Sequence, residues 1–320
     1  MMRPLPEDLG PRFSVRQAKS AGVSTGRLRR TDVDKPFHGV RVVSDATLPE
    51  ELEMDRWGRA LGPAERAHLA RALAYATRMS EGEFFSHITA AVILGIPLPY
   101  LLVARSLLHV SVFRPRRLPR SLGVRGHEAK PSLVTATRDE RSGLVIATPA
   151  AVWASLGRQL IDPYDLVAAG DAVVRTWRVE SPLATLADLQ TAVSAGRRVG
   201  VVAARLALPR VRTDSASRTE SWLRLTLIDH GLREPERNHE VFAGGIYLGC
   251  VDLAYPDLKI AIEYEGAHHL LDPEQWARDI ARYEGLRAAG WIVVQITKAE
   301  LFDQPAVAVQ RVRAAIRRRG

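Results

Sequence analysis

The chain of 320 residues is 46% hydrophobic and 25% charged, an ordinary composition for folded globular protein, and its length suits two or three domains of about 100–200 residues each. One cysteine, Cys250, excludes an intrachain disulfide and a cysteine-based zinc site. The N-terminus lacks the apolar segment of a signal peptide, and a glycine and prolines interrupt the most apolar run, Ile88–Ala104, so we expect a cytoplasmic protein without a membrane span.

The positive charge of the chain is unevenly distributed. A formal net charge of +9 and a sequence pI near 10.1 favour a polyanionic partner or a membrane surface. The segment Arg12–Arg30 contains six basic residues and no acid, and the end of the chain from Arg311 contains five arginines. We predict DNA, mainly duplex, as the partner, held through its phosphates, and no membrane partner. In the alternative interpretation, these arginines only keep helical faces solvated.

Residues 13–43 predict a small winged helix-turn-helix inside an N-terminal domain of residues 1–50. Val15–Ser20 is expected to form a short helix, followed by a tight turn. Ser24 is a candidate N-cap of a second helix that runs through Arg30. Gly39–Val43 alternates like an edge strand and would form the wing.

The predicted second helix could lie in a groove of DNA, because it presents several arginines. The candidate DNA contacts from this helix and its surroundings are Arg16, Thr25, Arg27, Arg29 and Arg30. The alternative is a small helical cap whose arginines serve only solubility.

Residues 51–212 form the predicted middle region, which is a mixture of helices and strands. No spacing of polar residues in it predicts a catalytic or metal-binding site, so we interpret the region as a scaffold. The expected elements are helices around Glu65–Thr77, after Ser86, after Thr148 and around Asp162–Arg175, and strands over Leu107–Val112 and up to Ala147.

Residues 213–320 form the third predicted domain. The order helix–strand–strand–helix–strand–helix predicts an α/β or α+β sandwich. The expected elements are a helix over Ser215–Leu232, strands over Gly245–Tyr255 and Leu258–Gly266, a helix over Pro273–Gly290, a strand over Trp291–Thr297 and a C-terminal amphipathic helix.

Carboxylates gather on one face of this predicted sheet. Side chains alternate along a strand, so Glu263 and Glu265 share one face, about 7 Å apart, and Ile260 and Ile262 point to the other. Asp252, on the partner strand, can reach the same face across a spacing of about 5 Å. Converging carboxylate oxygens favour Mg²⁺ or Mn²⁺, which would offset charge at a scissile phosphate. The alternative is that both glutamates lie on the solvent face of an antiparallel strand.

The stretches "VDLAYPDLKIAIEYEGAHH" and "RDIARYEGLRAAGWIVVQIT" together resemble the PD-(D/E)xK nuclease superfamily, in the branch related to very-short-patch-repair (Vsr) endonucleases. The resemblance covers about residues 215–302. It implies a restriction-endonuclease fold and Mg²⁺-dependent hydrolysis of phosphodiesters. It also implies that Asp252 and Glu263 hold the metal, and that the catalytic set consists of Glu220, Asp252, Glu263, Glu265 and His269.

Two positions of this site leave alternatives open. Glu265 stands where the superfamily has a lysine, so the metal, Lys259 or His269 would have to supply part of the positive charge beside the phosphate. Lys259 is therefore a further candidate DNA-binding residue. Glu220 could instead pair with Arg224, four residues further along its helix.

The segment 13–43 also resembles the winged-helix region of AbiEi-type abortive-infection antitoxins. That resemblance implies DNA binding, an antitoxin-like middle region, and a protein partner from a defence or toxin–antitoxin system. Two functions follow from the sequence: a metal-dependent DNA endonuclease, or a non-catalytic DNA-binding regulator with a degenerate nuclease domain. The carboxylate and histidine set favours the first, and the missing lysine favours the second.

Overall fold

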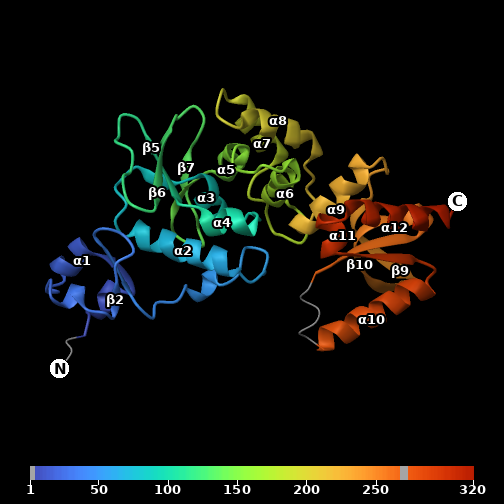
Figure 1. Cartoon of the computed structure of the whole chain (residues 1–320), viewed down its shortest axis with the longest axis horizontal. Coiled ribbons are helices and arrows are strands. Elements are labelled where there is room, and N and C mark those ends of the chain that lie inside the picture. The colour runs from blue at the N-terminus through green and yellow to red at the C-terminus, as the bar shows by residue number, and fades with distance from the viewer. Residues whose placement is uncertain (1–3, 267–272) are drawn as a thin grey trace. The chain divides into compact units, whose positions relative to one another are not determined.

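The structure, a computed structural model, describes residues 4–266 and 273–320, except for the side chains of 273–277. In this described part the protein is a mixed α/β molecule with helices and three separate sheets (Figure 1). None of the described helices combines the length and apolar character needed to cross a bilayer.

The chain divides into two compact units. Unit 1 comprises Met1–Ala169 and Leu183–Pro209, and unit 2 comprises Gly170–Pro182 and Arg210–Gly320. Unit 1 therefore combines residues 1–50 with most of 51–212. The segment 170–182 belongs with the C-terminal residues, and helix α6 (Pro163–Val174) carries the chain from one unit into the other.

Unit 1 begins with a three-stranded antiparallel sheet in the strand order β1-β3-β2. The expectation that Gly39–Val43 is an edge strand is wrong, because β3 is the central strand of this sheet. Its two partners are only three and two residues long, too short for a periodic pattern to predict. The elements are β1 (Arg12–Ser14), α1 (Val15–Ser20), β2 (Val33–Asp34) and β3 (Val40–Val43).

The predicted first helix is confirmed and the second is wrong. Helix α1 begins at a capping box formed by Ser14 and Gln17. The hydroxyl of Ser24 accepts the backbone N–H of Arg27 at 3.2 Å, as an N-cap would, but only a 3-10 turn, Arg27–Arg29, follows. Leu28 is the buried residue of this turn, so a single side chain anchors it and gives no apolar stripe on which a longer helix could pack.

The rest of unit 1 is built on a five-stranded sheet in the order β6-β5-β4-β8-β7, with buried aromatic side chains such as Phe84, Phe85 and Trp153. The expected helices and strands are present, while β4, β6, β7, α4, α7 and α8 are additional. The elements are α2 (Pro63–Ala76), β4 (Glu83–Phe85), α3 (His87–Leu94), α4 (Tyr100–Arg105), β5 (Leu108–Phe113), β6 (Val124–Ala129), β7 (Ala136–Arg138), β8 (Val145–Ala147), α5 (Pro149–Leu156), α7 (Leu186–Ser194) and α8 (Val201–Ala207).

Unit 2 contains a four-stranded sheet in the order β12-β11-β10-β9. Strands β9, β10 and β11 are antiparallel neighbours, and β11 and β12 are parallel, joined through α10. All expected elements are present, and strand β9 and the short helix α11 are additional. The elements are α9 (Arg218–Asp229), β9 (Glu236–Ala243), β10 (Ile246–Tyr255), β11 (Ile260–Glu265), α10 (Pro273–Ala288), β12 (Ile292–Thr297), α11 (Lys298–Phe302) and α12 (Pro305–Arg317).

Helices cover both faces of this sheet (Figure 1). Ile260 and Ile262 of β11 pack in one apolar cluster with side chains of α9, α11 and α12. Ala261 packs in a second cluster with Leu286 of α10. The predicted alternation along β11 is therefore confirmed, and it directs Glu263 toward α10.

Candidate functional site

Asp252 and Glu263 meet where the pairing of β10 with β11 ends. Leu253 pairs with Ile262, so the next antiparallel position brings Asp252 opposite Glu263. The ladder does not continue there. Instead, the Asp252 carboxylate accepts the backbone N–H of Tyr264 at 2.8 Å. This hydrogen bond fixes the Asp252 carboxylate at the edge of β11, next to Glu263.

Glu263 is almost completely buried, with 4% of the residue exposed. Its carboxylate accepts a hydrogen bond from a guanidinium nitrogen of Arg282, on α10, at 2.6 Å. Burial and the charge of Asp252 raise the pKa of Glu263 to about 8, although Arg282 acts in the opposite direction. Burial, the largest cause, and the charge of Asp252 together outweigh the opposing effect of the Arg282 guanidinium group.

Glu220 is the third acid of the cluster. It lies in the first turn of α9, whose N-cap is Ser217, and 6% of the residue is exposed. Its carboxylate accepts the backbone N–H of Ala216 at 2.9 Å and the side-chain amide of Asn238 at 3.0 Å. Burial and, next, the charge of Asp252 raise the pKa of Glu220 to about 7.

The alternative prediction, in which Glu220 pairs with Arg224, is wrong. Arg224 forms ion pairs with Asp171 and Glu234 instead. Arg224 is 1% exposed and lies one helical turn beyond Glu220, where these two acids and the Arg210 carbonyl occupy its guanidinium group. Glu220 thus stays available to the carboxylate cluster.

The charge of Asp252 acts on both of the other acids. The charge of Asp252 raises the pKa of both Glu220 and Glu263, so an added positive charge near Asp252 would relieve both repulsions. Within residues 4–266 and 273–320, no three acidic groups have their ligand atoms all within 4.8 Å of one another. Asp252 and Glu263, which lie opposite each other where the β10–β11 pairing ends, are the two carboxylates that could hold a divalent ion. Their oxygen ligands fit Mg²⁺ or Mn²⁺.

Three predicted site residues remain: Glu265, Lys259 and His269. Glu265 is half-buried and accepts a hydrogen bond from the side-chain amide of Gln295. Lys259 precedes β11 and donates to the carbonyl of Ala289 at 3.2 Å. It is thus about 13 Å along the strand from Glu263, too far to place its charge beside the carboxylates. His269 lies outside the described residues.

Sequence reasoning missed three residues that contact the acids: Asn238, Arg282 and Gln295. Only Arg282 had a signal in the sequence, and that signal came from the order of the elements. Arg282 is near the middle of a helix whose connection makes β11 and β12 parallel, so that helix must cross the face carrying Glu263. Gln295 is the register partner of Glu263. Asn238 belongs to β9, a strand whose polar composition concealed it.

The comparisons with known proteins find relatives but no matching family model and no matching solved structure. The relatives are Uncharacterized protein MT2308 of Mycobacterium tuberculosis (strain CDC 1551 / Oshkosh) and Uncharacterized protein Rv2248 of Mycobacterium tuberculosis (strain ATCC 25618 / H37Rv). Each is 32% identical over 197 residues, which cover 61% of this chain and 69% of the relative. The chain belongs to their family. Neither name states an activity, so a functional argument has to start from the geometry of this member.

In this family member, the predicted DNA contacts fall into two groups. Arg16, Thr25, Arg29 and Arg30 are exposed. Arg27 is held against the protein, because its guanidinium group donates two hydrogen bonds to Asp32 at 2.8 and 2.9 Å and its side chain is only 11% exposed. The exposed arginines can approach phosphates, whereas Arg27 stabilises its own turn.

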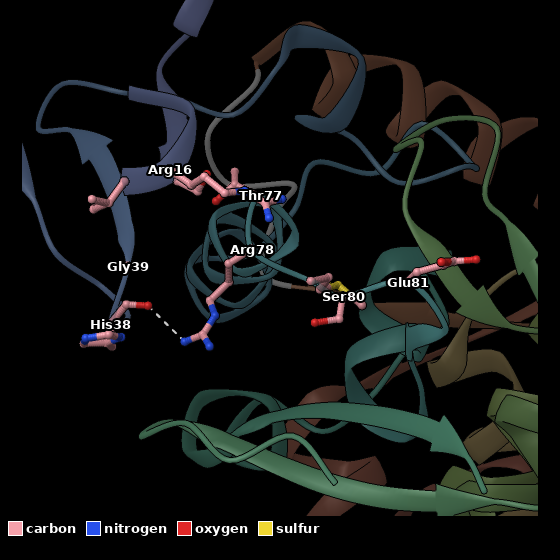
Figure 2. Close-up of a pocket in the computed structure, with 10 residues that line it drawn as sticks. Arg16, His38, Gly39, Thr77, Arg78, Ser80 and Glu81 are labelled. Atoms are coloured by element: carbon pink, nitrogen blue, oxygen red, sulfur yellow. Dashed lines mark hydrogen bonds between the residues drawn. The ribbon is translucent and has the colours of Figure 1, made fainter. Parts of the chain in front are cut away.

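Arg16 also lines an open cleft of about 500 Å³ in unit 1 (Figure 2). The cleft lies between α1, the start of β3 and the residues that follow α2. Arg78 projects across it and donates to the carbonyl of His38 at 2.9 Å. Two arginines thus border this cleft, together with Glu81.

Proposed function

We propose that this protein is a metal-dependent DNA endonuclease whose site is formed by Asp252 and Glu263. The observation that carries the proposal is their convergence at the end of the β10–β11 ladder, where the charge of Asp252 raises the pKa of two buried glutamates. The guanidinium group of Arg282 pairs with this cluster through Glu263.

The arrangement of unit 2 supports a PD-(D/E)xK-like fold. Two antiparallel strands carry the acids, an N-terminal helix contributes Glu220, and a crossover helix leads to a parallel strand. The acid-bearing end of β11 faces α10, whose Arg282 stands in a position to contact an anion held near Glu263. Arg282 thereby takes the charge role that Lys259 is too distant to play.

Each acid has a distinct part in the proposed hydrolysis. A divalent ion held by Asp252 and Glu263 would offset the charge of the scissile phosphate. Tyr264 N–H holds the Asp252 carboxylate in orientation. Glu220, with a pKa raised to about 7, can accept a proton from the attacking water near neutral pH.

DNA would be held by the exposed arginines of the N-terminal segment, which we interpret as a reduced winged-helix module. Phosphate contacts of this kind give affinity that depends strongly on salt and carries little sequence information. The 3-10 turn Arg27–Arg29 is too short to read bases as a recognition helix does. We therefore expect binding with weak sequence preference.

A non-catalytic DNA-binding regulator is the second candidate. The ion pair between Glu263 and Arg282, and the hydrogen bond between Glu265 and Gln295, favour it, because both occupy acids that a nuclease would turn toward a metal or water.

A nicking assay on supercoiled plasmid separates the two functions. The parent protein is expected to nick in Mg²⁺ or Mn²⁺, and the variants Asp252→Asn and Glu263→Gln are expected to lose this activity while binding DNA as before. Asp257→Asn is the matched control, because Asp257 is an exposed acid in the turn between the same two strands. DNA binding without nicking in either metal would favour the regulator. Activity retained in Asp252→Asn would exclude this site.

A further inference from the structure

Three histidines of unit 1 converge although they are far apart in the sequence. His109 lies on β5, His127 lies on the adjacent parallel strand β6, and His87 begins α3 directly after β4. These strands are neighbours in the order β6-β5-β4. Two adjacent strands and the start of the helix that follows β4 thus each place one imidazole in the same region, a placement that no local spacing in the sequence could predict.

The ligand atoms of the three rings lie within 4.8 Å of one another. A ring nitrogen of His127 is 3.0 Å from one of His109, and the rings of His87 and His127 stack with centroids 4.1 Å apart. Two nitrogens bound to one tetrahedral zinc ion, with bonds of about 2.0–2.1 Å, lie roughly 3.3 Å from each other. The nitrogen atoms would therefore have to approach one another by about 1.5 Å at most. The rings, which stack with interplanar angles of 24° and 19°, would also have to rotate so that their lone pairs converge on the ion.

Neighbouring groups hold the imidazole ring of His87 in place. The Nδ1 atom of His87 is hydrogen-bonded to the Ser86 hydroxyl at 2.9 Å, which leaves its Nε2 atom for a ligand. Ser86 in turn accepts a hydrogen bond from Ser111 at 2.7 Å. His87 adopts a left-handed φ of 48°, a costly conformation for a residue other than glycine. Outer contacts of this kind orient histidine ligands in metal sites.

The chemistry of the set fits a transition ion better than Mg²⁺. Burial lowers the pKa of His109 to about 3 and that of His127 to about 4, so the rings are neutral, which is the form that binds metal. Arg125 lies close enough to lower both pKa values, and its charge opposes a cation, but Arg125 is exposed and solvent screens it. Imidazole nitrogens suit zinc, copper, iron and nickel.

We propose that His87, His109 and His127 form a binding site for a divalent transition ion, with Zn²⁺ as the ion that suits it best. Three imidazole ligands leave a fourth position open, and His87 and His127 are only half-buried, so an external ligand can reach that position. The site is separate from the carboxylates of unit 2 and does not depend on the proposed nuclease function.

Zinc binding by the full chain tests this proposal. The measurement uses the Asp252→Asn/Glu263→Gln double variant, because it lacks the other candidate metal ligands. Protein without an affinity tag is treated with a chelator, then titrated with Zn²⁺ against a chromophoric competitor and, separately, with Co²⁺ followed by its visible absorption. We expect one ion per chain and a Co²⁺ spectrum typical of a four-coordinate ion with three nitrogen ligands and one exchangeable ligand.

Substitutions of the histidines and of Ser86 show whether the ion binds at this site. His109→Asn and His127→Asn should each weaken Zn²⁺ binding by more than about 100-fold, because loss of an outer partner alone costs about 10–100-fold. Ser86→Ala should fall within that smaller range. His68→Gln is the matched control, since His68 is buried nearby but bonds to Thr89. His127 is more exposed than His109, so its variant keeps the test valid if His109→Asn fails to fold. The absence of stoichiometric Zn²⁺ binding, or full binding in folded His127→Asn, would overturn the proposal.

Discussion

Two sheets of this protein bury titratable side chains, and they do so with opposite chemistry. In unit 2 the buried groups are carboxylates with raised pKa values, and in unit 1 they are imidazoles with lowered ones. Burial favours the uncharged form in both, which the acids reach by keeping a proton and the histidines by losing one. Oxygen and nitrogen ligands also prefer different ions. The two proposed sites would therefore select different ions.

Removing Arg282 should give the largest change in stability. Without the guanidinium group, Glu263 would be left buried beside Asp252, and breaking a largely buried ion pair typically costs about 3–5 kcal/mol. Because Glu263 can take up a proton, we expect Arg282→Met to lower the free energy of unfolding by more at pH 8, where part of the Glu263 population is ionised, than at pH 5, where Glu263 is protonated. Urea denaturation in chelator, at both pH values, measures this.

The double variant Arg282→Met/Glu263→Gln is the control for that prediction. It removes the buried charge along with its partner, so most of the lost stability should return. An equal loss in Arg282→Met at pH 5 and pH 8 would mean that Arg282 acts through packing and not through the charge of Glu263.

The two sheets should respond to pH with opposite signs. Glu220 and Glu263 bind protons more tightly in the folded chain, so the stability they contribute is complete below about pH 4.5 and is lost as pH rises toward 7 and 8. His109 and His127 bind protons less tightly when folded, so their contribution is complete above about pH 6.5 and is lost as pH falls toward 4 and 3. Each effect should be on the order of a few kcal/mol.

Denaturation of metal-free protein across pH 4–9 tests these signs. Glu263→Gln should flatten the decline on the alkaline side, and His109→Asn should flatten the decline on the acid side. If Glu263→Gln altered only the acid side, the assignment of a raised pKa to Glu263 would be wrong.

The smallest predicted effect concerns DNA affinity. Arg29→Ser/Arg30→Ser should weaken binding about tenfold and reduce the dependence of log K on log salt by about 2, since each phosphate contact contributes about 0.9. Arg27→Ser is the matched control, because its guanidinium group pairs with Asp32; we expect unchanged DNA affinity and a stability loss below about 1 kcal/mol. Fluorescence anisotropy at several salt concentrations measures both. Equal weakening by the two variants would contradict the distinction between exposed and paired arginines.

Most of unit 2 could be predicted from sequence because its elements are long and strongly patterned. The alternation over Ile260–Glu265 was enough to assign Glu263 to the face opposite Ile260 and Ile262. The contacts that set the chemistry were harder, because Arg282 and Asn238 reach the acids from elements whose packing direction has no local signature. Strand β9 was missed for a similar reason, since its exposed, charged residues conceal any alternation.

Unit 1 was predicted less well because its short strands pair with strands that are far away in the sequence. Strands of two and three residues, such as Val33–Asp34, carry no period, so β3 looked like an edge. The arginine-rich segment after Ser24 has a cap but no apolar stripe, and it forms only one 3-10 turn. The convergence of the three histidines depends on the order of the strands in the sheet, which hydrophobic periodicity does not predict.

The central claim is that Asp252 and Glu263 form one metal-holding site. Isothermal titration of Mn²⁺ into the His109→Asn variant tests it most directly, because the nitrogen ligands of unit 1 are then impaired. We predict one Mn²⁺ per chain, retained in Asp257→Asn and lost when Asp252→Asn is added. Mn²⁺ binding that is unchanged by Asp252→Asn, or absent from the starting variant, would contradict the claim.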